Sequence, residues 1–355
     1  MALLMITLAG AAAAGEARRK VILDDDGFGT AQWMVIKSPD IEVLGMAAVT
    51  GDFWRDEAMA RGLRGLEIIG RSDIPVLPGA TNPLLNSEKL TDRWEALYGK
   101  LVWKGAWMKR WVEPTEQSLP KYHTPEVVPN LPQGTPTTKP SAEIAALFMI
   151  RKVHEFPGEV SIVATGPLTN LALAQRLDPQ FAALAKELVY MGGSLNPQQR
   201  RSGTTAAQFA REFVNSPRRE FNIHFDPEAA RIVFHAPWKK IVMVPVDPAT
   251  ETEMSPELVR RLSRGNTLLA GLIRMEQGFP LWDQIAAAVW LDPSLIKDSA
   301  QLYVDVDTTF GPDYGNTLTW SPGYQPDLDE QLQTAVRAVD VPRLEAMMAT
   351  LLTAR

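Results

Sequence analysis

The sequence has 355 residues, of which 45% are hydrophobic and 22% charged, so it is long enough for one large α/β domain or two small ones with a buried core. Its 36 basic and 42 acidic residues give a formal net charge of −6, without the Lys/Arg blocks that follow a phosphate backbone, which argues against a nucleic acid partner. The absence of cysteine excludes disulfides, thiolate metal sites and a cysteine nucleophile.

Residues 1–17 form a short apolar run that ends in small residues. This pattern fits the hydrophobic region and cleavage site of a secretory signal better than a membrane span, although the usual positive start is missing. We therefore expect an exported protein, with an N-terminal strand or helix of a cytoplasmic protein as the alternative. No later segment is apolar enough to cross a bilayer.

Residues 18–355 are predicted to form a single domain in which strand and helix periodicity alternate. The predicted strands are 20–26, 42–52, 159–166, 187–193 and 239–247, and the predicted helices are 56–70, 141–156, 168–177 and 226–235. This alternation predicts an α/β fold with an open, mostly parallel, Rossmann-like sheet and helices on both of its faces.

Residues 94–140 interrupt the alternation. Its first part contains five aromatic residues, which are Trp94, Tyr98, Trp103, Trp107 and Trp111. A stretch rich in Pro, Thr and Gln follows them. A long irregular insertion is typical of a lid, a binding loop or an interface. The alternative is that the aromatic side chains only pack the segment onto the body of the domain.

Polar residues follow the predicted strands, at the edge where open α/β sheets bind their ligands. They are Asp24 to Asp26, Asp52, Thr165, Gly192 to Asn196, and Asp247. Consecutive carboxylates repel one another, and a hard divalent cation with oxygen ligands is the usual remedy. A solvated acidic turn is the alternative, because exposed like charges cost little in water.

Two other interpretations of this turn compete. Gly27 to Gly29 contain a GxG, which is a weak signal for a dinucleotide loop because the third glycine is absent. The segment LDDDG also resembles haloacid dehalogenase-like phosphatases, with Asp24 as nucleophile, Asp26 as acid/base and Thr165 as the phosphate-holding hydroxyl. That family also needs a lysine and a late acidic pair, for which the sequence offers no convincing candidates.

Four long segments, in the same order and spacing, resemble the inosine-uridine-preferring nucleoside hydrolase family. They are ATGPLTNLALA at 164–174, VYMGGS at 189–194, REFNIHFDPEAARIVF at 219–234 and LWDQIAAAVWLDPSLI at 281–296. With the acidic turn and YVDVDTTFGPDYGNTLTW at 303–320, the resemblance extends over about residues 20–350.

The resemblance implies hydrolysis of the N-glycosidic bond of ribonucleosides by water, with a Ca²⁺ ion at the floor of a deep pocket. The implied metal ligands are Asp24, Asp26, the carbonyl of Thr165, and Asp283, with Asp26 also acting as general base. Calcium accepts carboxylate, carbonyl and water oxygens together, and a metal-bound water beside a carboxylate is a nucleophile. Family members are often dimers or tetramers, so the resemblance also implies a homodimer or homotetramer.

The resemblance further implies that Asp52, Asn215, Glu220 and Asn222 bind the ribose. Trp282 stands before the late acid where many members have histidine, and this Trp-Asp pair resembles the purine-preferring branch, in which an aromatic residue stacks on the leaving base. A second aromatic residue, such as Trp54 or, from the insertion, Trp103 or Trp107, could stack on the other side of the base. Trp282 as ordinary core packing is the alternative.

The turn departs from the family pattern Asp-x-Asp-Pro-Gly-x-Asp-Asp, because Thr30 and Ala31 replace the last two acids. Two hypotheses therefore remain open. One is a hydrolase that cleaves N-ribosidic bonds with an altered metal geometry. The other is a non-catalytic protein that binds ribosides or sugars.

Overall fold

The computed structural model describes residues 18–113, 121–201, 203–264 and 267–354, so the predicted signal segment lies outside the described residues. A nine-stranded sheet runs through the described chain in the order β3-β2-β1-β4-β5-β6-β9-β7-β8. The strands are β1 (Arg19–Asp25), β2 (Ile41–Ala48), β3 (Val76–Pro78), β4 (Val160–Ala164), β5 (Glu187–Met191), β6 (Ile241–Val244), β7 (Ile296–Val306), β8 (Thr317–Trp320) and β9 (Leu332–Val339). Strands β1 to β6 and β9 run parallel, whereas β7 is antiparallel to both of its neighbours.

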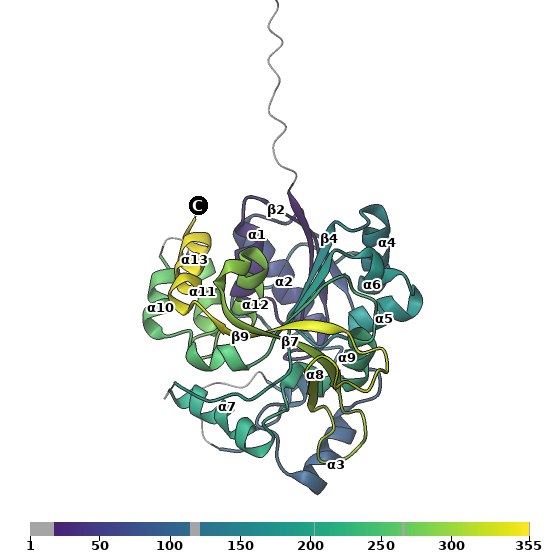
Figure 1. Ribbon diagram of the computed structural model, residues 1–355. Helices are drawn as coiled ribbons and strands as arrows, with labels where there is room; N and C mark the ends of the chain where they lie inside the picture. Colours follow the sequence, from purple (N-terminus) through teal and green to yellow (C-terminus); the bar gives the residue numbers. More distant parts are fainter. Residues whose placement is uncertain (1–17, 114–120, 202, 265–266, 355) are drawn as a thin grey trace, which may run out of the picture.

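Helices cover both faces of the sheet (Figure 1). The α-helices are α1 (Thr30–Lys37), α2 (Arg55–Ile69), α3 (Glu88–Tyr98), α4 (Ala145–Glu155), α5 (Thr169–Leu177), α6 (Phe181–Leu184), α7 (Thr204–Asn215), α8 (Phe221–Phe225), α9 (Pro227–Phe234), α10 (Pro256–Leu262), α11 (Thr267–Met275), α12 (Trp282–Leu291) and α13 (Val341–Thr353). Short 3₁₀ helices are η1 (Gly105–Trp107), η2 (Asp247–Glu251) and η3 (Pro293–Leu295). The predicted α/β fold with a mostly parallel sheet is confirmed.

Two apolar cores lie on opposite faces of the sheet. One contains Leu23 of β1 and side chains of α1, α2 and α10 to α13, and the other contains Ile22 of β1 and side chains of α4, α5, α6, α8 and α9. In Figure 1, α10 and α13 lie on one side of the sheet and α4 and α6 on the other. Because side chains alternate along a strand, the residues that follow Ile22 and Leu23 also face opposite cores.

The insertion contains more regular structure than its composition predicts. Trp94 and Tyr98 belong to α3, which begins before the insertion, and Trp107 ends η1. In the described residues from Met108 to Ile144, the backbone forms turns and bends without a further helix or strand. Trp107 stacks on Phe225 of α8 with ring centroids 4.3 Å apart, so this part of the insertion packs onto the body of the domain.

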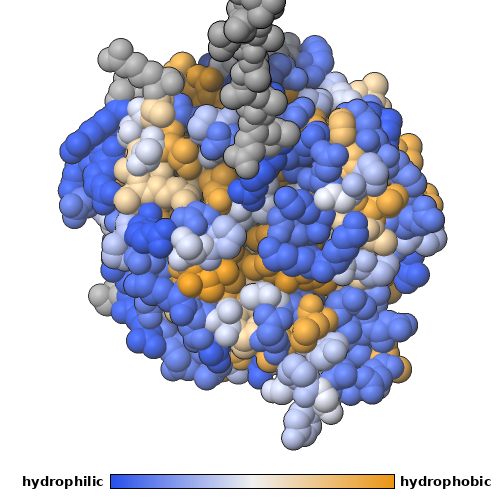
Figure 2. All heavy atoms as spheres, turned by 45° about the horizontal axis from the view of Figure 1, so that its top comes forward, coloured by the Kyte–Doolittle hydropathy of each residue, from blue (hydrophilic) through white to orange (hydrophobic). Residues whose placement is uncertain are grey.

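Hydrophilic residues cover most of the face drawn in Figure 2, and apolar residues form smaller patches between them. None of the helices in the described chain combines the length and hydropathy that crossing a membrane requires.

Candidate active site

Asp25 holds the turn between β1 and α1. One carboxylate oxygen of Asp25 accepts hydrogen bonds from the main-chain N–H groups of Gly27 (2.8 Å) and Phe28, and Phe28 has a left-handed φ of 54°. The other oxygen accepts bonds from Thr165 Oγ1 at 2.5 Å and Gln32 Nε2 at 2.9 Å. Burial raises the pKa of Asp25, while these bonds favour its ionised form. The carboxylate therefore ties β1, α1 and the end of β4 together.

Asp24 lies on the opposite face of β1 from Asp25. It is fully buried, and its Oδ1 accepts a hydrogen bond of 2.7 Å from Asn170 Nδ2 of α5, on the side of the second core. Its Oδ2 is also buried and has no hydrogen-bond partner in the described part of the chain. Burial raises the pKa of Asp24 to about 8. The structure therefore brings Asp25, rather than Asp24, to the face shared with α1 and α12.

Asp26 and Asp52 meet at the carboxyl ends of β1 and β2. Asp26 Oδ2 accepts a hydrogen bond of 2.6 Å from the main-chain N–H of Asp52. Gly51 makes this approach possible, because a Cβ at that position would lie 2.0 Å from the same oxygen. Burial raises the pKa of Asp26 well above its usual range, and the charges of Asp52 and Asp25 raise it further. The other oxygen, Oδ1, accepts no hydrogen bond from any described residue, which leaves it free to accept a proton.

Trp103 of the insertion contacts this acidic group directly. Its indole Nε1 donates a hydrogen bond of 2.5 Å to Asp52 Oδ1, and its ring packs against Trp111 with centroids 5.2 Å apart. Burial raises the pKa of Asp52 to about 6, and the bond from Trp103 opposes this rise. The insertion therefore supplies a polar contact to the site as well as apolar packing.

Asp283 reaches the same group from the first turn of α12. Burial raises its pKa well above the usual range, and the charges of Asp25 and Asp52 add to the rise. No described residue donates a hydrogen bond to this carboxylate. Thr165, at the end of β4, directs its hydroxyl to Asp25, and its carbonyl accepts a bond of 3.2 Å from Asn222 Nδ2.

A carboxylate far away in the sequence contacts Thr30, one of the two positions where the family pattern has an acid. Glu276, just after α11, accepts hydrogen bonds from Thr30 N at 2.7 Å and Thr30 Oγ1 at 2.5 Å, and another from Gln284 Nε2 at 2.7 Å. Burial raises its pKa to about 7. Glu276 thus places an acid at the N-terminal end of α1, where negative charge is favourable. No local pattern in the sequence predicted a role for Glu276.

Glu220 and Asn222 lie together at the N-terminal end of α8. Glu220 accepts bonds from the N–H groups of Asn222 (2.8 Å), Ile223 (3.1 Å) and Gly193 (2.9 Å), and burial raises its pKa to about 7. Asn222 Nδ2 donates to the carbonyls of Thr165 and Met191, each at 3.2 Å. Its Oδ1 has no hydrogen bond to the described residues and can accept one from a ligand hydroxyl.

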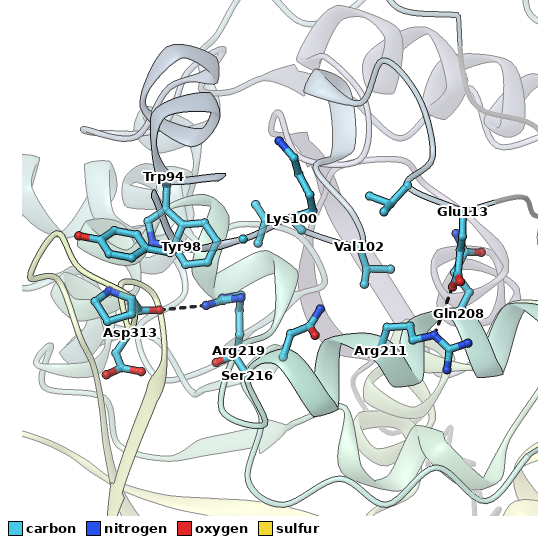
Figure 3. A pocket seen from close by; sticks show the side chains of 15 residues that line it. Trp94, Tyr98, Lys100, Val102, Glu113, Gln208, Arg211, Ser216, Arg219 and Asp313 are labelled. Carbon is cyan, nitrogen blue, oxygen red and sulfur yellow. Dashed lines mark hydrogen bonds and ion pairs between the residues drawn. The ribbon is translucent and has the colours of Figure 1, made fainter. Parts of the chain in front are cut away.

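Trp282 and Asn215 occupy different surroundings. Trp282 is half-buried and forms an aromatic cluster with Phe209 and Phe279, at centroid distances of 5.0 and 6.2 Å. Asn215 is the exposed last residue of α7 and lines a cavity of about 460 Å³. Figure 3 shows the other side chains around this cavity, including Trp94, whose ring centroid lies 4.4 Å from the guanidinium carbon of Arg219. The residues lining this cavity include none of the acids of the turn.

The donors around Asp26 fit a hard divalent cation. The carboxylates of Asp26, Asp52 and Asp283 and the carbonyl of Thr165 are all oxygen ligands, which is the set that Ca²⁺ prefers. Burial and neighbouring carboxylates raise the pKa of Asp26 and of Asp283 together. Such a concentration of buried negative charge is neutralised by protons or by a cation.

Comparisons with known proteins identify the family of this chain. A family model described as inosine-uridine preferring nucleoside hydrolase matches residues 21–346. The pyrimidine-specific ribonucleoside hydrolase RihB of Escherichia coli O9:H4 is 27% identical over 324 residues, which cover 85% of this chain and 87% of RihB. Probable uridine nucleosidase 1 of Oryza sativa subsp. japonica is 35% identical over 220 residues, which cover 61% of this chain and 55% of the rice protein.

Solved structures give the same match. The plant nucleoside hydrolase PpNRh1 has a TM-score of 0.69 at 26% identity, covering 95% of this chain and 99% of that enzyme. The purine-preferring ribonucleoside hydrolase of Gardnerella vaginalis also has a TM-score of 0.69, over 94% of this chain and 98% of that enzyme. Because its identity is only 21%, this match supports the fold alone.

Proposed function

The chain belongs to the inosine-uridine preferring nucleoside hydrolase family, a family of N-glycosyl hydrolases, and we propose that it hydrolyses ribonucleosides to ribose and free base with the acids around Asp26. The family match over residues 21–346 decides between this resemblance and the phosphatase one. One observation supports the proposal most: the fold brings the buried Asp26 at the end of β1, the half-buried Asp52 after β2 and the half-buried Asp283 of α12 into one acidic group.

We further propose that this group binds Ca²⁺. The ion would be held by Asp26, Asp283 and the carbonyl of Thr165. Asp25 adds negative charge from the face of β1 that packs against α1 and α12. Asp24 is less suited to this role than its sequence position implied, because it faces α5 and bonds to Asn170. A bound Ca²⁺ would neutralise the carboxylates and bind oxygen atoms of the ribose and of the attacking water.

Four residues around the acidic group act on the water and the ribose in the proposed reaction. Asp26 accepts a proton from water through Oδ1, while the N–H of Asp52 holds Oδ2 in place. Asn222 Oδ1 accepts a hydrogen bond from a ribose hydroxyl, and Glu220 and Asp52 lie close enough for the charge of Asp52 to affect Glu220. These contacts assist catalysis when they tighten as the sugar flattens.

The base preference is a separate proposal. Trp282 of α12, the helix that bears Asp283, forms an aromatic wall with Phe209 of α7 and Phe279 of the segment before α12. Such a wall favours an extended purine base. The names of the bacterial and rice relatives instead favour pyrimidine nucleosides for the same site. Comparing kcat/KM for inosine, guanosine, uridine and cytidine decides between the two.

The test of the proposed activity is the release of reducing sugar from this nucleoside panel, with Ca²⁺ and after its removal by a chelator. We expect release to require Ca²⁺, and Asp26→Asn to lower kcat about 10²- to 10⁴-fold, the usual contribution of a general base. Asp178→Asn is the control, because Asp178 pairs with the exposed His154 and does not touch the acidic group. Calcium binding without sugar release from any nucleoside would favour the non-catalytic binding protein.

A further inference from the structure

A second group of metal-ligating side chains lies at the other end of the sheet. His235 follows α9, Asp305 belongs to β7, and Glu330 stands two residues before β9. One ring nitrogen and one oxygen from each acid lie within 4.8 Å of one another. Strand β7 is five positions from β1 in the sheet, which at about 4.8 Å per strand separates the two strands by about 24 Å. This group is therefore distinct from the acids around Asp26.

Two atoms of this group are buried without hydrogen-bond partners among the described residues. They are Glu330 Oε1 and His235 Nε2, and Glu330 as a whole is only 6% exposed. The other oxygen of Glu330 accepts a bond of 2.8 Å from the N–H of Leu328, so only Oε1 of this carboxylate lacks a partner. Buried polar atoms are almost always paired, and two unpaired atoms in one cluster indicate a missing partner.

The distances between the donor atoms suit a small cation. Asp305 Oδ2 lies 3.2 Å from His235 Nε2, without the geometry of a hydrogen bond. Two ligands at about 2.1 Å from a tetrahedral Zn²⁺ lie about 3.4 Å apart, so this pair is already spaced as two such ligands. Glu330 lies within 4.8 Å of both and closes the set by a small side-chain movement.

The charge of the group is incompletely balanced. Arg231 Nη2 lies 3.8 Å from Asp305 Oδ2, so one partly exposed cation faces two buried acids. A divalent ion can supply the remaining positive charge. A donor set of one imidazole and two carboxylates suits Zn²⁺ and similar transition metals, whereas Ca²⁺ prefers oxygen ligands throughout.

We propose that His235, Asp305 and Glu330 bind one transition metal ion, of the Zn²⁺ type, in addition to the metal of the active site. The three ligands come from the end of α9, from β7 and from the segment before β9. Among the described residues, the main chain already joins two of these parts, since the N–H of Gln331 donates to the carbonyl of Phe234 at 3.1 Å. The ion therefore fastens the antiparallel end of the sheet to α9.

The test titrates the full chain with Zn²⁺, after the chain has been stripped of metal and saturated with Ca²⁺. We expect one Zn²⁺ per chain by elemental analysis and a rise in Tm. His235→Gln and Glu330→Gln should each weaken binding at least tenfold and abolish the rise in Tm. His154→Gln is the matched control, because His154 is exposed and pairs with a single acid at 2.7 Å; it should change neither quantity.

Two results overturn the proposal. One is Zn²⁺ binding whose affinity is the same in wild type, His235→Gln and Glu330→Gln. The other is loss of Zn²⁺ binding in Asp283→Asn, which assigns the titration to the active site. Glu330→Gln keeps the shape of the side chain, and the circular dichroism spectrum of each variant confirms that the chain has folded.

Discussion

The hydrogen bond from Trp103 to Asp52 tests whether the insertion takes part in the reaction. Trp103→Phe removes the indole N–H that lies 2.5 Å from Asp52 Oδ1 and keeps most of the apolar ring surface. A hydrogen bond to a charged group contributes about 1.5–3 kcal/mol. Since about 1.4 kcal/mol corresponds to a factor of ten, we expect kcat/KM to fall about 10- to 150-fold.

The assay is steady-state release of ribose, with Tm measured on the same samples. Trp94→Phe is the control, because Trp94 also loses an indole bond, of 2.7 Å to the carbonyl of Gly311, but this bond is remote from the acids. We expect it to lower Tm without a comparable loss of kcat/KM. An unchanged kcat/KM in Trp103→Phe, or equal losses in both variants, would refute a direct role of the insertion.

Three further predictions concern the acids, the aromatic wall and the insertion. Asp283→Asn should lose bound Ca²⁺ and sugar release together, and unchanged Ca²⁺ by elemental analysis would exclude Asp283 as a ligand. Trp282→Ala should reduce purine nucleoside turnover more than inhibition by ribose, and equal losses would count against stacking. Burial alone would raise the pKa of Glu67, but hydrogen bonds from Thr138, Arg64 and Thr137 lower it to about 2. The ionised form of Glu67 therefore stabilises the fold above about pH 4.5, and Glu67→Gln should lower Tm at neutral pH. The difference in Tm between this variant and wild type should shrink as pH falls from about 4.5 towards 2. A difference in Tm that is independent of pH would contradict this role.

The sheet and its ligand-binding edge could be predicted because they depend on local patterns. Buried parallel strands are continuous apolar runs, and the predicted strands 20–26 and 159–166 lie where β1 and β4 are found. The C-terminal strands β7 to β9 were not predicted. Their pairing is antiparallel and partly exposed, and β7 includes polar residues along its length, so the apolar run is missing.

Whether Asp24 or Asp25 faces α1 depends on which side of β1 each helix covers. Alternation along β1 predicts that the two side chains face opposite ways, but the sequence does not say which helices lie on which face. Asn170 of α5 holds Asp24, and Gln32 of α1 holds Asp25. Only the packing of these two helices shows which carboxylate faces α5 and which faces α1.

The region around Thr30 illustrates a non-local effect. Helix α1 begins after Gly29, which has no side chain to cap it, and the helix was not among the predicted elements. Its first N–H is bonded by Glu276, a residue 246 positions away. A motif comparison finds two acids missing at Thr30 and Ala31, whereas the folded chain supplies one from the segment after α11.

A crystal structure with Ca²⁺ and ribose tests most directly whether the acids around Asp26 form a Ca²⁺ site that binds ribose. We predict an ion bound by Asp26, Asp283 and the carbonyl of Thr165, with ribose hydroxyls completing its shell and Asn222 bonded to one of them. Ribose bound away from Asp26, or Ca²⁺ held by other residues while the acids around Asp26 bind none, would contradict the claim.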